Sequence, residues 1–110
     1  MNEQEEMMSA KAAAQVEIKH AVGLHARPSV KLTKLAKTFA ADVEMALDAG
    51  GPWIDAKSIV KVMAAKAPKG TMLHLRANGE GAESAVKALV ELVERDFDES
   101  TEGEAHVRTA

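Results

Sequence analysis

The sequence predicts an α+β fold, an open-faced β-sandwich in which a four-stranded antiparallel sheet is covered on one face by three helices. Three observations support this. The hydrophobic period switches repeatedly between two residues and about 3.6 residues, in the order β-α-β-β-α-β-α. Turn sequences such as "AGGP" and "NGEG" separate some of these segments. In a chain of 110 residues, this order is typical of a single domain with a split β-α-β arrangement.

Four segments alternate between apolar and polar residues and are predicted to be strands. They are residues 14–20, 42–48, 53–56 and 71–77. In the first segment Val16 and Ile18 share one face, and in the last Leu73 and Leu75 do so. The middle two segments flank a turn and are predicted to form a hairpin. The apolar faces are expected to lie under helices.

Three further segments carry apolar residues at helical spacing. The first begins near Ser29, the second opens at Ser58 and stops at Pro68, and the third runs to about Phe97. The apolar positions are Leu32, Leu35, Ala36 and Phe39 in the first helix, Ile59, Val62 and Met63 in the second, and Ala85, Val86, Leu89, Leu92 and Val93 in the third. Each stripe is expected to pack on the sheet.

The two ends of the chain lack usable periodicity. Residues 1–14 are predicted to be a flexible extension, residues 15–98 the folded domain, and residues 99–110 a flexible acidic tail. No apolar run approaches the roughly 18 residues that span a bilayer. The N-terminus also lacks the basic-then-apolar layout of a signal peptide. We therefore expect a cytoplasmic protein without membrane insertion, and a monomer by default.

The charge pattern narrows the class of partner. The net charge is −3, yet residues 15–90 hold eleven basic and seven acidic side chains, a net +4. A positive body suits an anionic ligand or an acidic partner. Nucleic acid is not expected, because the excess is small and three aromatic residues offer few stacking surfaces. There is no cysteine and no metal-ligand spacing among the histidines, so no metal and no cofactor is expected.

The sequence "GLHARPS" places His25, Arg27 and Pro28 where the first helical pattern begins. Proline suits a first helical turn, where backbone N–H groups lack intrahelical partners. Those N–H groups and the helix dipole favour an anion, phosphate in particular. Arg27 adds donors that match phosphate oxygens, and a neutral imidazole is a nucleophile near pH 7. The residues therefore indicate a site at which His25 carries a phosphoryl group beside Ala26, Arg27 and Pro28.

Three strings, "GLHARPS", "AKSIVKVM" and "ANGEGAESAVKALVELV", closely resemble the HPr family. Its members are histidine-containing phosphocarriers of the bacterial phosphoenolpyruvate-dependent sugar phosphotransferase system. The resemblance covers roughly residues 15–96. It implies that His25 accepts a phosphoryl group, on Nδ1 in this family, from phosphorylated enzyme I. His25 would pass the group to IIA domains of sugar permeases, with Arg27 as its phosphate partner. Such a protein is a carrier rather than a free-standing catalyst.

Ser58 stands at the start of the second predicted helix. Serine is a favoured N-cap, and this structural role is the first interpretation. In some relatives the matching serine is phosphorylated by a dedicated kinase, so the resemblance also implies a serine kinase/phosphorylase as a partner. Lys61 and Lys66 stand where those relatives usually have glycines, which weakens the regulatory interpretation.

The second helix also supplies a candidate docking surface for protein partners. Ile59, Val60 and Met63 are predicted to form an apolar patch beside His25. Lysines are expected to surround it, which suits transient docking to acidic proteins. These lysines are Lys31, Lys57 and Lys61. The competing interpretation is that the apolar residues belong to the core and the lysines to a solvated face.

Two alternative functions remain open at this point. One is an HPr-like carrier in a regulatory, nitrogen-type branch or in a dihydroxyacetone phosphorylation branch, in which only the recipient differs. The other is a metabolite-sensing βαββαβ module, to which His25 would be unimportant. The "HARP" string favours a phosphocarrier over the sensing module.

Overall fold

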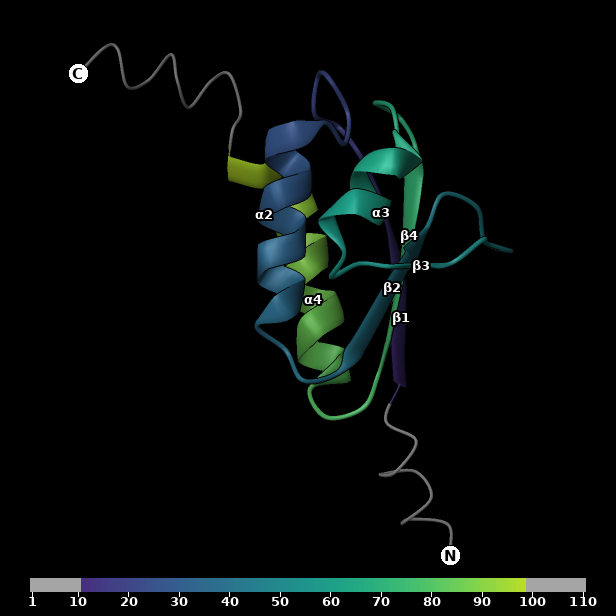
Figure 1. The fold of residues 1–110 in the computed structure, drawn as a ribbon, viewed down its shortest axis with the longest axis vertical. Coiled ribbons are helices and arrows are strands. Elements are labelled where there is room, and N and C mark those ends of the chain that lie inside the picture. The colour runs from purple at the N-terminus through teal and green to yellow at the C-terminus, as the bar shows by residue number, and fades with distance from the viewer. Residues whose placement is uncertain (1–10, 99–110) are drawn as a thin grey trace, which may run out of the picture.

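The computed structural model describes residues 11–98, and their arrangement is shown in Figure 1. The elements are β1 (Lys11–Glu17), α2 (Ala26–Lys37), β2 (Asp42–Ala46), β3 (Ile54–Asp55), α3 (Ile59–Ala65), β4 (Met72–Asn78), α4 (Ala82–Glu94) and a short 3-10 turn, η1 (Asp96–Asp98). The predicted order β-α-β-β-α-β-α and the predicted fold class are confirmed. Within residues 11–98, no helix has the length and apolar character needed to span a bilayer.

The sheet has the strand order β1-β4-β2-β3 and is antiparallel throughout. β4 lies inside it and pairs along its whole length with β1, from Lys11 opposite Asn78 to Glu17 opposite Met72. Strand alternation buries Leu73 and Leu75 on the covered face. The hairpin is confirmed as well, although β3 is only two residues long.

The helices cover one face of this sheet. α2 and α4 lie side by side (Figure 1), and α3 packs against α2 and β3. The apolar stripes of α2 and α4 point into the core, as the spacing predicted. Their largest fully buried apolar side chains are Leu32, Leu89 and Val93. This layer places the start of α2 beside the chain that follows α3.

The first strand begins earlier than the predicted domain boundary at residue 15. Residues 11–14 belong to β1 and pair with residues 75–78 of β4. The predicted strand began at Ala14 and left out residues 11–13, because alanine fits either face of a sheet and shows no alternation. The predicted extension at residues 1–10 and the predicted tail at residues 99–110 lie outside the described residues.

The last helix is shorter than predicted, because α4 ends at Glu94 rather than near Phe97. Asp96, Phe97 and Asp98 have φ values of 60°, 56° and 59°. Left-handed residues cost about 1 kcal/mol each. Burial of the whole Phe97 ring offsets that cost. Lys31 Nζ also donates a hydrogen bond of 2.9 Å to the Phe97 carbonyl, which ties η1 to α2.

Candidate functional site

His25 is the N-cap residue of α2. Its backbone is extended, with φ −97° and ψ −158°, and its carbonyl accepts the first helical hydrogen bond from Ser29 N–H at 3.0 Å. The imidazole makes no capping hydrogen bond and is exposed. The ring is therefore accessible to an incoming group at the head of the helix.

α2 begins at Ala26, three residues before Ser29, near which the sequence pattern placed its start. The Ala26 and Arg27 N–H groups precede the first helical hydrogen bond, and Pro28 has no N–H. The side chains of Ala26 and Arg27 are exposed, whereas Pro28 and Ser29 are buried and anchor the turn. No acidic residue stands in this turn, so its positive dipole end is not neutralised from within the helix.

The loop before His25 is held by backbone hydrogen bonds. Leu24 N–H donates to the Ala67 carbonyl at 2.8 Å, and His25 N–H donates to the Gly23 carbonyl at 2.9 Å. His20 accepts twice: its carbonyl from Gly23 N–H at 2.9 Å and its Nδ1 from Val22 N–H at 3.3 Å. These contacts hold the backbone that carries the imidazole.

A shallow hollow of about 470 Å³ lies beside the imidazole. It is lined by Val22, Leu24, His25, Ala26, Met63, Lys66, Ala67 and Pro68. Lys66, Ala67 and Pro68 were not predicted to be site residues. No local sequence signal marks them, because only the packing of the chain after α3 against the His25 loop brings them there.

The sequence profile of the family described as "PTS HPr component phosphorylation site" matches residues 12–95. The chain belongs to the HPr family. It is 39% identical over 87 residues to the phosphocarrier protein HPr of Pseudomonas aeruginosa, covering 79% of this chain and 96% of that protein. It is 34% identical to the phosphocarrier protein NPr of Escherichia coli, covering 76% and 92%. A crystal structure of HPr-C-His from Thermoanaerobacter tengcongensis superposes with a TM-score of 0.74 at 34% identity, covering 81% and 98%.

The predicted docking residues of this HPr family member form two groups, the exposed residues of α3 and two lysines whose side chains are held by hydrogen bonds. Val60 and Met63 are exposed by 73% and 40%, and Met63 shares the hollow with His25. Lys61 is exposed, and Ile59 is half-buried. Met63 is therefore exposed next to His25, and Val60 and Lys61 are exposed on the same helix.

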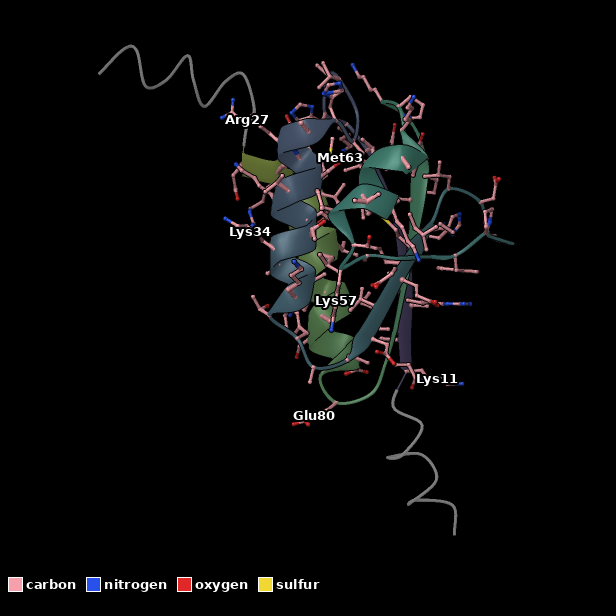
Figure 2. All side chains as sticks on the ribbon, viewed as in Figure 1. Lys11, Arg27, Lys34, Lys57, Met63 and Glu80 are labelled. Carbon is pink, nitrogen blue, oxygen red and sulfur yellow. The ribbon has the colours of Figure 1, made fainter. Side chains whose placement is uncertain are left out.

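The other two predicted docking lysines are held by hydrogen bonds. Lys31 Nζ donates to the Phe97 carbonyl, and Lys57 Nζ donates to the Phe39 carbonyl at 2.8 Å. Phe39 lies beyond the C-terminal end of α2, so Lys57 is near the opposite end of that helix from His25, as Figure 2 shows for its side chain. Lys57 therefore lies away from the hollow beside His25. The direction of the Lys57 side chain depends on its hydrogen bond to the Phe39 carbonyl, which the position of Lys57 in the sequence did not reveal.

Ser58 is the N-cap of α3, and its Oγ accepts a hydrogen bond from Lys61 N–H at 3.2 Å. The capping interpretation is therefore confirmed. Ser58 is half-buried. Its phosphorylation by a kinase stays a prediction.

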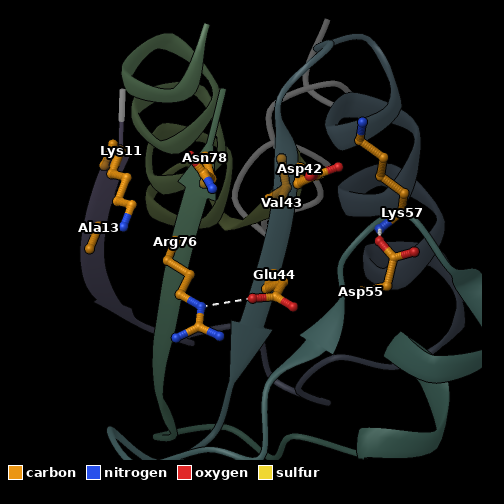
Figure 3. A pocket seen from close by; sticks show the side chains of 11 residues that line it. Lys11, Ala13, Asp42, Val43, Glu44, Asp55, Lys57, Arg76 and Asn78 are labelled. Carbon is orange, nitrogen blue, oxygen red and sulfur yellow. Dashed lines mark hydrogen bonds and ion pairs between the residues drawn. The ribbon is translucent and has the colours of Figure 1, made fainter. Parts of the chain in front are cut away.

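A second, larger hollow of about 860 Å³ lies on the uncovered face of the sheet (Figure 3) and is not lined by His25. Charges of both signs surround it, and Arg76 Nε pairs with Glu44 Oε1 at 2.7 Å. The Arg76 guanidinium also lies 3.9 Å from the centre of the Trp53 ring. Because Arg76 is paired with Glu44, and Asp42 and Asp55 add further carboxylates to the lining, the hollow is a poorer phosphate site than the start of α2.

Proposed function

We propose that this protein carries a phosphoryl group on His25, accepting it from phosphorylated enzyme I and passing it to IIA components for sugar uptake in the cytoplasm. One observation carries the proposal: His25 is the N-cap residue of α2, directly before the first-turn N–H groups, and its side chain is exposed and makes no capping bond. Membership of the HPr family supports it and weighs against the metabolite-sensing alternative.

The chemistry follows from that placement. A neutral imidazole has an unprotonated nitrogen whose lone pair attacks phosphorus in line, while the bond to the donor's leaving group breaks. No general base is required, because the attacking nitrogen carries no proton. The N–H groups of Ala26 and Arg27, the helix dipole and the Arg27 guanidinium supply positive charge for the phosphoryl oxygens. The phosphorylated ring is a good leaving group, which suits onward transfer.

Partner docking is proposed for the exposed patch beside His25. Val60 and Met63 give a small apolar centre and Lys61 a positive border. Such a surface suits fast, reversible contact with acidic faces of enzyme I and IIA domains. A nitrogen-type carrier is the second candidate, because the NPr relative is only slightly less similar than the HPr relative.

The test is incubation with enzyme I and phosphoenolpyruvate, followed by intact-mass measurement. We expect one added, acid-labile phosphoryl group, absent in His25→Ala. His74→Ala is the matched control, since His74 lies on the uncovered face of the sheet, away from the hollow beside His25. Arg27→Ala should still be labelled, at a rate reduced by roughly 100-fold. Equal labelling of His25→Ala, or an unlabelled wild type, would refute the proposal.

A competition experiment separates the two branches. The phosphorylated protein is offered equal amounts of a sugar-type and a nitrogen-type IIA domain, and loss of label is followed in time. Faster transfer to the sugar-type domain supports the sugar branch. Faster transfer to the nitrogen-type domain assigns the protein to the regulatory branch and leaves the role of His25 intact.

A further inference from the structure

β1 is an edge strand of the sheet, paired with β4 on one side only among the described residues. Ile18 N–H donates to the Thr71 carbonyl, so the backbone of residue 18 points toward β4. Backbone groups alternate in direction along a strand. The outward N–H and C=O groups are therefore those of Lys11, Ala13, Gln15 and Glu17. An exposed edge of this kind is a template for another strand.

The side chains of β1 make this edge complementary to itself. In an antiparallel pair of two β1 strands, each residue whose backbone groups point outward must stand opposite another such residue. Outward residues are every second residue, so the two-fold axis of the pair passes through a residue and not between two neighbouring residues. Centring on Ala14 uses all seven residues of the strand. It also places Lys11 of each copy opposite Glu17 of the other. Both side chains are exposed and lie on the uncovered face, where opposite charges across a strand pair stabilise it.

The covered face beside this edge is apolar and open. A groove of about 460 Å³ runs between β1 and α4. Ala12 and Ala14 of β1 line it together with Val86 and Val90 of α4, and charged α4 residues border it. These border residues are Glu83, Lys87, Glu91 and Glu94. In a β1 pair centred on Ala14, Ala12 would face Val16 of the other copy and continue this apolar layer across the junction.

We propose that a second copy of this chain binds along β1, antiparallel and centred on Ala14, and joins the two sheets edge to edge. We infer a second copy as the partner because Lys11 and Glu17 of one β1 strand are complementary to Glu17 and Lys11 of another. The association is weak and reversible, in contrast to the monomer expected from the sequence. β3, against which α3 packs, lies at the opposite edge of the sheet, so the docking patch beside His25 stays accessible.

Sedimentation velocity of the full chain over a concentration series tests the pairing. We expect reversible dimers at high concentration. Lys11→Glu places like charges opposite each other at both ends and should weaken the dimer by about tenfold. The double variant Lys11→Glu, Glu17→Lys restores the opposite charges in reversed order and should recover the dimer. A wild type that stays monomeric, or a double variant as weak as the single one, would overturn the proposal.

Single cysteines test the register. The chain has no cysteine, so an introduced thiol is the only one present. In the proposed pair the two Ala14 residues form a non-hydrogen-bonded pair with Cα atoms about 4.5 Å apart, within disulfide reach. Ala14→Cys should therefore cross-link on mild oxidation. Ala13→Cys and Gln15→Cys should not, because each residue would be more than about 7 Å from its own copy. Preferred cross-linking at residue 13 or 15 would contradict the register.

Phosphoryl acceptance distinguishes this proposal from the carrier function. Lys11→Glu alters neither the His25 loop nor the docking patch, so its labelling by enzyme I should match that of the wild type. A loss of dimer with unchanged labelling supports the β1 surface. A loss of labelling in this variant would contradict the proposed separation of the two surfaces.

Discussion

A Cβ atom on Gly23 would lie only 2.4 Å from the carbonyl oxygen of Ala67. The loop that precedes His25 and the chain that follows α3 therefore meet backbone to backbone. Leu24 N–H bonds to that same carbonyl. The position of the imidazole thus depends on a segment more than forty residues further along the sequence.

Gly23→Ala should disturb both stability and phosphoryl acceptance. The residue has φ +71°, and the new Cβ would collide with Ala67. We expect a loss of about 2 kcal/mol or more in urea unfolding, and slower labelling by enzyme I. Gly70→Ala is the control, because Gly70 also has positive φ (+93°) but has nothing within 4 Å of a built Cβ. It should cost about 1 kcal/mol and leave labelling unchanged. Equal effects of the two variants would argue against the contact.

Ser58→Ala should remove the cap of α3. The lost hydrogen bond to Lys61 N–H is expected to reduce the free energy of unfolding by about 1 kcal/mol. Ser58→Asp should retain most of this stability, because its carboxylate can accept the same bond near the positive end of the helix. Urea unfolding measures both. Ser84→Ala, at an exposed position inside α4, should show no loss.

Lys66→Gly should stabilise the protein. Lys66 ends α3 in the left-handed conformation, with φ 52° and ψ 46°, and its N–H donates to the Met63 carbonyl. Glycine adopts this conformation without a Cβ penalty, so we expect a gain of about 0.5 kcal/mol or more in thermal or urea unfolding. Lys69→Gly, whose φ is not positive, should give no gain. A destabilised Lys66→Gly variant would contradict the left-handed cap.

Phe97→Ala should be among the most damaging substitutions outside the site. The ring is wholly buried and packs edge-on against the His20 ring, with the two ring centres 6.0 Å apart. The backbone carbonyl of Phe97 accepts a hydrogen bond from Lys31. A buried phenylalanine reduced to alanine costs about 3–5 kcal/mol. Urea unfolding should show a much larger loss than for Phe39→Ala, since Phe39 is only partly buried. Similar losses would mean that Phe97 does not belong to the core.

Asp98 should contribute stability that disappears in acid. The hydrogen bond from Arg95, together with the charges of Arg95 and Lys31, lowers the pKa of Asp98 below its ordinary value of 3.8. The folded pKa lies below the unfolded one, so this contribution is present above the unfolded pKa and is lost as pH falls through the folded one. The effect is small because the pair is exposed. A carboxyl NMR titration should show the Asp98 pKa rising toward 3.8 in Arg95→Gln.

The part of the site that lies within one stretch of chain was predictable. His25, Arg27 and Pro28 are adjacent, and the positions of N-cap and first turn follow from local backbone chemistry. Ser58 as a cap followed for the same reason. The contribution of Ala67 and Pro68 was not predictable, because nothing local indicates that their backbone meets the His25 loop.

Long side chains show the same limit. Lys31 and Lys57 occupy helical or near-helical positions that suggested a rim around His25, yet each reaches a backbone carbonyl elsewhere. Lysine has several rotatable bonds, so its direction depends on which acceptor lies within reach after folding. Residues 11–13 were left out of the predicted first strand because an alanine run shows no alternation, and only the pairing with β4 makes them part of β1.

By itself, the sequence determined the order of the strands and helices, the covered face of the sheet and the imidazole at the start of α2. Periodicity and capping are local properties, so they can be read from neighbouring residues. Only the tertiary structure decided which loop supports His25, where the lysines point, and that β1 lies at an edge of the sheet among the described residues. These features depend on contacts between segments far apart in the chain, and packing of the whole core selects them.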